Sequence, residues 1–176
     1  MVAIWTPLIV NSFVAGASKT SIGLLAAVPQ VCTIVGMILW GRRSDRTQER
    51  RWHTIVPMLA AAVGWLLTAY SSQPWVQLAG LCLASTGAYT AMSIFWTMPD
   101  HALSFAARAV GIAVINATGN ISSALNPLIV GWLKDLTQSF GTGLIYASIM
   151  MAIGCAIMLI VPVAASEKHA PAIANA

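Results

Sequence analysis

Charged side chains are scarce in this sequence. Only 8% of its 176 residues are Asp, Glu, Lys or Arg, whereas 58% are hydrophobic. A soluble domain carries roughly 25% charged residues, most of them on its surface. The shortage therefore argues against a soluble fold and predicts an all-α, polytopic membrane protein that is surrounded by the lipid bilayer.

Cysteine and the common cofactor motifs are also rare or missing. The three cysteines stand singly in apolar runs, without Cys-x-x-Cys or Cys/His spacing. We therefore expect no disulfide framework, no metal site and no cofactor. The glycine-rich phosphate loop of ATP-driven proteins is absent, and the apolar runs contain no catalytic pair, so we expect no enzyme. The net charge of +4 is confined to short polar segments, which argues against nucleic acid as a partner.

Long apolar runs recur along the chain. A helix that crosses a bilayer needs about 20 mainly apolar residues. We expect a partial span at 1–12 and full spans at 21–40, 54–70, 75–97, 109–133 and 142–163. A membrane domain would then occupy residues 1–163, and residues 164–176 would form a polar tail.

Positive charge gathers in one segment between two of these spans. Residues 41–53 hold five of the nine basic residues and two of the five acids, so we expect a short charged loop there. Seven of the nine basic residues, Lys168 among them, fall on one side of the expected topology, and Lys19 and Lys134 fall on the other. Because basic loops stay in the cytoplasm, we expect a multi-pass protein of the inner (plasma) membrane with a cytoplasmic C-terminus.

The order of residues within this charged loop predicts a latch. Gly41 would let two helices approach closely at the membrane edge. Asp45 lies among several arginines, and a carboxylate can pair with guanidinium groups in one conformation and lose them in another. A plain solvated anchor on the cytoplasmic side is the alternative interpretation.

A few polar side chains lie inside the expected spans. Asn116 and Asn120 are four residues apart and share one helix face. Ser93 and Trp96 are three apart, and both a hydroxyl and an indole N–H can donate to a carboxylate. These residues are candidates for binding a substrate, and hydrogen bonding between helices is the alternative for the two amides.

The charged segment resembles a known family motif. The pattern Gly41-x-x-x-Asp45-Arg46, followed by Arg50-Arg51, is similar to the signature loop of the major facilitator superfamily. The run 44–53 resembles its version in the anion:cation symporter family, and the stretches 95–99, 113–120 and 126–135 are similar to the last third of that family. The likeness is to bacterial permeases for organic anions such as hydroxyphenylacetate, phthalate and tartrate. Gln48 replaces the usual glycine before the paired arginines, and Glu49 replaces a basic residue.

The resemblance implies that this chain is the C-terminal half of a twelve-helix transporter, without its N-terminal half. It implies transport of a small organic anion by alternating access, coupled to protons. The implied gating residues are Gly41, Arg42, Asp45, Arg46, Arg50 and Arg51. The implied substrate-binding residues are Asn116, Asn120, Ser93 and Trp96. A truncated, inactive fragment and an unrelated structural membrane subunit are the alternatives.

Overall fold

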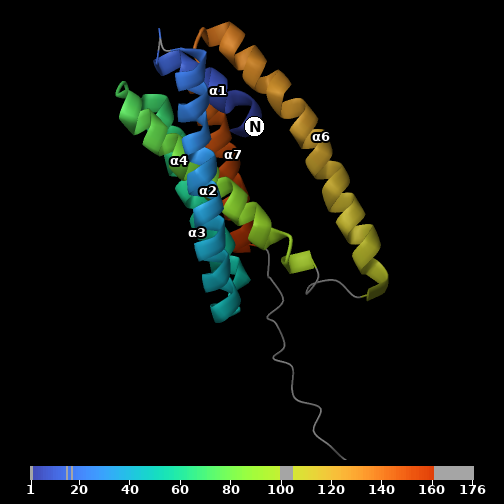
Figure 1. The fold of residues 1–176 in the computed structure, drawn as a ribbon. Helices are drawn as coiled ribbons and strands as arrows, with labels where there is room; N and C mark the ends of the chain where they lie inside the picture. Colours follow the sequence, from blue (N-terminus) through green and yellow to red (C-terminus); the bar gives the residue numbers. More distant parts are fainter. Residues whose placement is uncertain (1, 15, 17, 100–104, 161–176) are drawn as a thin grey trace, which may run out of the picture.

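A computed structural model of the protein describes residues 2–14, 16, 18–99 and 105–160, and within them the secondary structure is α-helical (Figure 1). The helices are α1 (Val2–Phe13), α2 (Lys19–Thr47), α3 (Arg50–Tyr70), α4 (Pro74–Phe95), α6 (Phe105–Thr137) and α7 (Gly141–Ile160). The expected all-α membrane fold is therefore confirmed.

Four of the described helices, α2, α3, α4 and α7, are long and apolar enough to cross a membrane. They contain most of the spans expected at 21–40, 54–70, 75–97 and 142–163. The span expected at 109–133 lies within α6, which has 33 residues. A helix of that length extends about 50 Å and exceeds the bilayer core. Amides and hydroxyls interrupt its apolar sequence, and α6 is not among the helices that are apolar enough over a full span.

The charged segment at 41–53 is mainly helical, so the expectation of a loop there was wrong. Helix α2 continues to Thr47, where Gln48 adopts a left-handed conformation (φ 54°) and its N–H bonds to the carbonyl of Ser44. Only Gln48 and Glu49 connect α2 to α3. Arginine is a good helix former, so the backbone keeps its helical hydrogen bonds after the chain leaves the apolar run.

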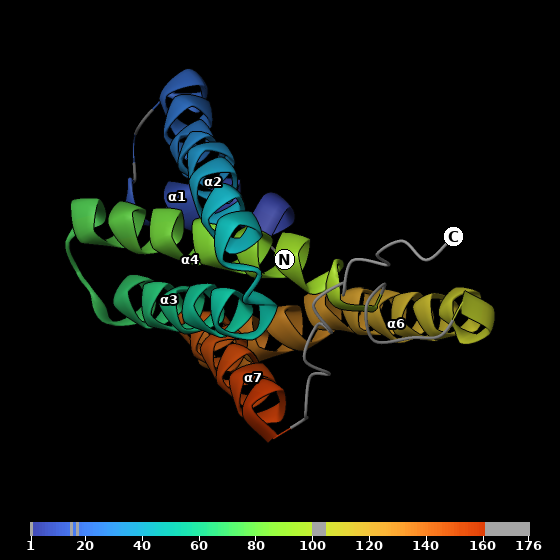
Figure 2. The same ribbon diagram turned by 90° about the horizontal axis from the view of Figure 1, so that it is seen from below.

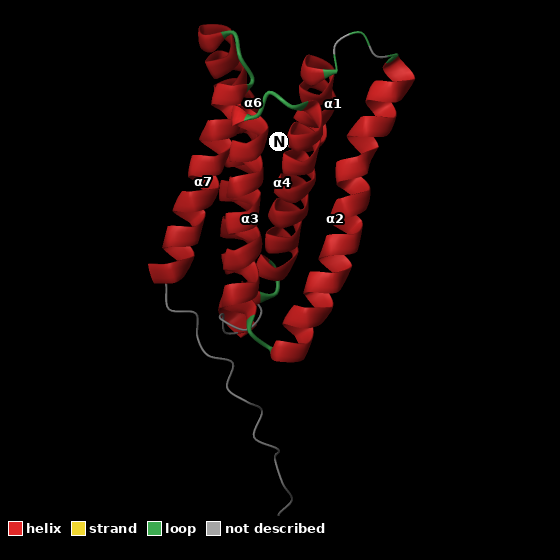
Figure 3. Ribbon diagram, turned by 90° about the vertical axis from the view of Figure 1, so that its left-hand side faces the viewer, coloured by secondary structure: helices red, strands yellow, loops and turns green. Residues whose placement is uncertain are grey.

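Four helices form a row in the order α2, α4, α3 and α7 (Figures 2 and 3). The short helix α1 lies against α2 and α4 at one end of this row. Their buried side chains form one core cluster, which includes Ile9, Val10, Trp65, Leu81, Ala84, Leu144 and Ala147. Apolar side chains on the outer faces of the row, such as Leu24 and Val31 of α2, are exposed, as expected for lipid contact.

Glycines bring α3 and α4 close together at the centre of the row. A Cβ atom on Gly64 would lie 2.5 Å from the backbone nitrogen of Ala84, and one on Gly87 would lie 2.3 Å from the carbonyl oxygen of Pro57. Small residues at a helix interface allow this approach in membrane proteins. Gly41 was expected to have this role, but a Cβ there would meet no described atom within 4 Å.

Helix α6 stands away from the row along most of its length (Figures 1 and 2). It packs on α7 near its C-terminal end, where Val130 is buried and faces Gly143. Most side chains between residues 109 and 125 are exposed. The expected tail at 164–176 and part of the connection after α4 lie outside the described residues.

Candidate functional site

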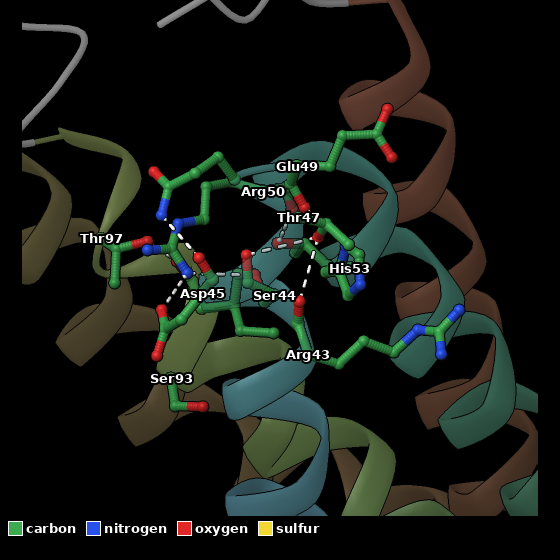
Figure 4. Close-up of polar contacts among 12 residues, drawn as sticks. Arg43, Ser44, Asp45, Thr47, Glu49, Arg50, His53, Ser93 and Thr97 are labelled. Carbon is green, nitrogen blue, oxygen red and sulfur yellow. Dashed lines mark hydrogen bonds and ion pairs between the residues drawn. The ribbon is translucent and has the colours of Figure 1, made fainter. Parts of the chain in front are cut away.

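An ion pair joins the end of α2 to the start of α3 (Figure 4). The Arg50 guanidinium lies 2.7 Å from the Asp45 carboxylate and donates to the buried Ser44 hydroxyl at 3.0 Å. It is the one ion pair in which both partners are described residues. The Asp45 side chain is 67% exposed, so water screens the attraction, and such a pair contributes about 0.2–1 kcal/mol. An interaction this weak can break and form again.

Arg51 binds the end of a distant helix. Its Nε donates to the carbonyl of Met158 at 3.0 Å, and another guanidinium nitrogen donates to the carbonyl of Leu159. Both carbonyls belong to the last described turn of α7, and a cation near the C-terminal end of a helix interacts favourably with the helix dipole. The planar fork of arginine can satisfy two such carbonyls at once, and this ties α3 to α7 at one end of the row.

A tryptophan and a histidine pack against each other beside the same α2–α3 connection. The Trp40 indole N–H donates to the carbonyl of His53 at 3.0 Å, and the His53 Nδ1 lies 2.6 Å from the carbonyl of Glu49. The imidazole is buried, and the two rings lie 5.5 Å apart. We name the group formed by Trp40, Ser44, Asp45, Arg50, Arg51 and His53 the charged corner.

The other arginines of the predicted gating loop point outward. Arg42 and Arg46 are exposed at the end of α2, one turn apart on the same face. The structure therefore uses Arg50 and Arg51 to bind other parts of this chain and leaves Arg42 and Arg46 at the surface. Sequence reasoning named these four arginines together and could not separate their roles.

The predicted substrate-binding residues do not form one cluster. Asn116 and Asn120 are exposed on the part of α6 that stands away from the row. Ser93, near the end of α4, donates to the carbonyl of Thr90 at 2.9 Å. Trp96 follows the end of α4, where its ring meets that of Phe95 edge-on.

A cavity of about 580 Å³ lies between α6 and three helices of the row, α3, α4 and α7. Five of the eight methionines in the sequence line it, together with the aromatic rings of Trp65, Tyr89 and Phe95. Helix α6 contributes Ser123 and Asn126, and the Asn126 Oδ1 is buried without a hydrogen-bond partner in the described part of the chain. One feature of the sequence points to this amide, its place inside an expected span next to Pro127.

Exchange of Arg51 for alanine should loosen the last turn of α7. Two carbonyls would lose a charged donor, and we expect a local destabilisation of about 1–2 kcal/mol. This is less than buried hydrogen bonds to a charged group contribute, because Arg51 is partly exposed. Hydrogen–deuterium exchange should become faster for the amides near the end of α7. Arg43→Ala is the matched control, because that side chain is exposed on α2, and unchanged exchange in Arg51→Ala would contradict the prediction.

The fold and the charged corner together define an integral membrane protein built from packed apolar helices. Comparison with known proteins identifies the family. The sequence model of the Major Facilitator Superfamily matches residues 1–175, so this chain belongs to that family.

Relatives with assigned names include a protein of Agrobacterium vitis named for tartrate transport, which is 38% identical over 89% of this chain. A quinolone resistance transporter of Acinetobacter baumannii is 32% identical over 90% of it. The inner membrane transport protein RhmT of Escherichia coli (strain K12) is 33% identical over 82% of it. The alignments cover 34%, 36% and 34% of these relatives, so the chain spans about a third of their length.

Proposed function

We propose that this chain forms the C-terminal half of a transporter that carries a small organic anion across the inner membrane. The substrate would be a carboxylate, such as an aromatic or sugar acid, and transport would be coupled to protons. Residues 1–163 would form the membrane half, and residues 164–176 a cytoplasmic tail. An N-terminal half, for which the greater length of the relatives leaves room, would complete the substrate path.

The charged corner is the observation that carries this proposal. It ties α2, α3 and α7 together at one end of the row through one exposed ion pair and one helix-end contact. Alternating access needs contacts at the membrane face that hold one state and release in the other. The corner, together with Gly41, Arg42 and Arg46 at the end of α2, is suited to act as this latch.

The amides of α6 and the names of the relatives support this substrate class. The side chains of Asn116 and Asn120 are exposed, and neither side chain is hydrogen-bonded to another described residue, which favours a ligand over a contact between helices within this half. An amide N–H can donate to a carboxylate, and the names of the relatives include tartrate. Ser93 and Trp96, at the end of α4, would line the same path.

Uptake by intact cells tests this function. The complete gene product would be expressed in bacteria that do not take up tartrate or hydroxyphenylacetate, and uptake of each radiolabelled acid would be measured. We expect uptake of at least one acid, with loss of accumulation when a protonophore collapses the proton gradient. No uptake of either acid by protein that reaches the membrane would contradict the proposal. Uptake that a protonophore leaves unchanged would contradict proton coupling alone.

Exchange of Asp45 for asparagine tests the latch. The change removes the charge that Arg50 binds, and an exposed pair of this kind contributes about 0.2–1 kcal/mol. We expect transport to become about twofold to fivefold slower, with an unchanged preference among acids and normal amounts of protein in the membrane. Asp135→Asn is the matched control, because Asp135 is also exposed but lies at the opposite end of the bundle. A loss of membrane expression would instead make Asp45 a folding residue.

A further inference from the structure

Two cysteine thiols from different helices meet where α2 packs on α4. Cys32 lies near the middle of α2 and Cys82 lies in α4, and their side chains are hydrogen-bonded to each other. Both are free thiols in this structure. Sequence spacing could not reveal this pair, because α3 separates the two helices along the chain.

A glycine allows α2 and α4 to approach closely beside these thiols. Gly36 faces Thr86, and a Cβ atom on Gly36 would lie 3.6 Å from the Thr86 Cβ. The Cβ atoms of a disulfide lie roughly 3.5–4.5 Å apart. Gly36 and Thr86 each follow the cysteine of their own helix by one turn, so the two pairs lie on neighbouring turns of one contact face. The spacing of the helices is therefore suited to a disulfide between Cys32 and Cys82.

The two thiols differ in access. Cys32 is exposed on α2, whereas Cys82 is partly buried. A small reagent therefore reaches Cys32 first. The thiolate is the nucleophile in cysteine chemistry, and an S–H group beside the reacting sulfur can stabilise the negative charge on it. This arrangement makes Cys32 the attacking thiol and Cys82 the thiol that resolves the product.

We propose that Cys32 and Cys82 form a modification site, at which hydrogen peroxide oxidises the two thiols to a disulfide that ties α2 to α4. The Cys32 sulfur attacks one peroxide oxygen, the O–O bond breaks, and the other oxygen leaves as water with the thiol proton. The Cys82 sulfur then attacks the sulfenic acid on Cys32, the S–O bond breaks, and a second water leaves with the Cys82 proton. The electrons that the thiols lose reduce the peroxide to water. The inference does not depend on the proposed function.

The disulfide would fasten a helix that is otherwise held on one side. Helix α2 packs mainly on α4, and most of its side chains are exposed. The new bond would close a long loop that includes α3, and a cross-link of this kind restricts the unfolded chain. The oxidised protein should therefore unfold at a higher temperature than the reduced protein, and a thiol reductant should reverse the shift.

Peptide mapping of the purified complete gene product in lipid nanodiscs tests the inference. The protein would be reduced, treated with hydrogen peroxide, blocked with N-ethylmaleimide in denaturant and digested with pepsin at low pH, where thiols exchange slowly. We expect a peptide with Cys32 joined to a peptide with Cys82, and reduction should separate them. Cys155 is the internal control, because it is buried in α7 with its thiol 3.8 Å from the carbonyl oxygen of Ile55, and it should carry the maleimide.

Two variants test the roles of the thiols and of the helix spacing. Cys82→Ser leaves the sulfenic acid on Cys32 unresolved, so dimedone should label Cys32 roughly tenfold more strongly than in the unaltered protein. Gly36→Leu would push α2 away from α4, and the yield of the joined peptides should fall severalfold. Gly23→Leu is the matched control on α2, because a Cβ there meets no described atom within 4 Å, and it should leave the yield unchanged.

Three results would overturn the inference. Peroxide may leave both thiols free, or it may carry Cys32 to the sulfinic acid without any joined peptide, and then the two cysteines only fill space between the helices. A dimer on a non-reducing gel would show that the joined peptides come from two copies of the chain. Joined peptides from a monomer, absent in Cys82→Ser, would support it. No substrate enters these measurements, so none of the results bears on the proposed transport.

Discussion

The exchange Gly64→Ala should prevent α3 and α4 from packing as they do in this structure. The added methyl group would lie 2.5 Å from the backbone nitrogen of Ala84 and 2.6 Å from the carbonyl oxygen of Gly80. Backbone atoms cannot rotate away as a side chain can, so the two helices must separate. Overpacking of this kind costs about 1–3 kcal/mol. Because α3 and α4 stand at the centre of the row, the cost would affect the whole bundle.

Thermal unfolding of the purified protein in detergent would measure this effect, with the fraction of monodisperse protein as a second readout. Gly131→Ala is the control, since it makes the same change within α6 at a position where a Cβ meets no described atom within 4 Å. We expect the control to melt at the same temperature as the unaltered protein, or slightly higher, because alanine favours helix. Equal melting temperatures for Gly64→Ala and the unaltered protein would show that α3 and α4 are not packed this closely.

The exchange Asn116→Ala should reduce uptake strongly while the amount of protein in the membrane stays normal. A hydrogen bond to a charged group contributes about 1.5–3 kcal/mol. Its loss would lower kcat/KM for an organic acid roughly tenfold to a hundredfold. Folding should not change, because the Asn116 side chain is exposed and contributes no hydrogen bond to the described part of the fold.

Ser122→Ala provides the comparison for Asn116→Ala. Both residues are exposed on α6, but the Ser122 hydroxyl is already bonded to the carbonyl of Thr118 within its own helix. We expect its uptake to equal that of the unaltered protein. If Asn116→Ala also transports normally, Asn116 only packs against neighbouring helices or lipid, and the substrate path must use other residues.

The charged segment shows what could be predicted from the sequence and where prediction stopped. Composition alone showed that residues 41–53 lie outside the apolar spans, since no bilayer interior accepts so many charges. It did not show that α2 continues to Thr47. Nor did it distinguish Arg51 from its neighbours, because the carbonyls that Arg51 binds are more than one hundred residues away in the sequence.

The glycines show the same limit. The sequence contains many glycines inside apolar runs, and each is compatible with close packing or with an open surface. Gly41 was selected because of its motif, but the close contacts with a neighbouring backbone belong to Gly64, Gly80 and Gly87. Which glycine meets a backbone depends on how two helices are rotated about their axes, and local sequence does not contain that angle.

The sequence by itself determined the class of this protein, the places of its helices and the family motif. These follow from the cost of placing charge and unpaired backbone in lipid, which acts on each segment separately. Only the tertiary structure decided that Arg51 binds α7 and that Asn126, not Asn116 or Asn120, lines the cavity beside α6. Those relations join residues on different helices, and they arise from the way the helices pack against one another.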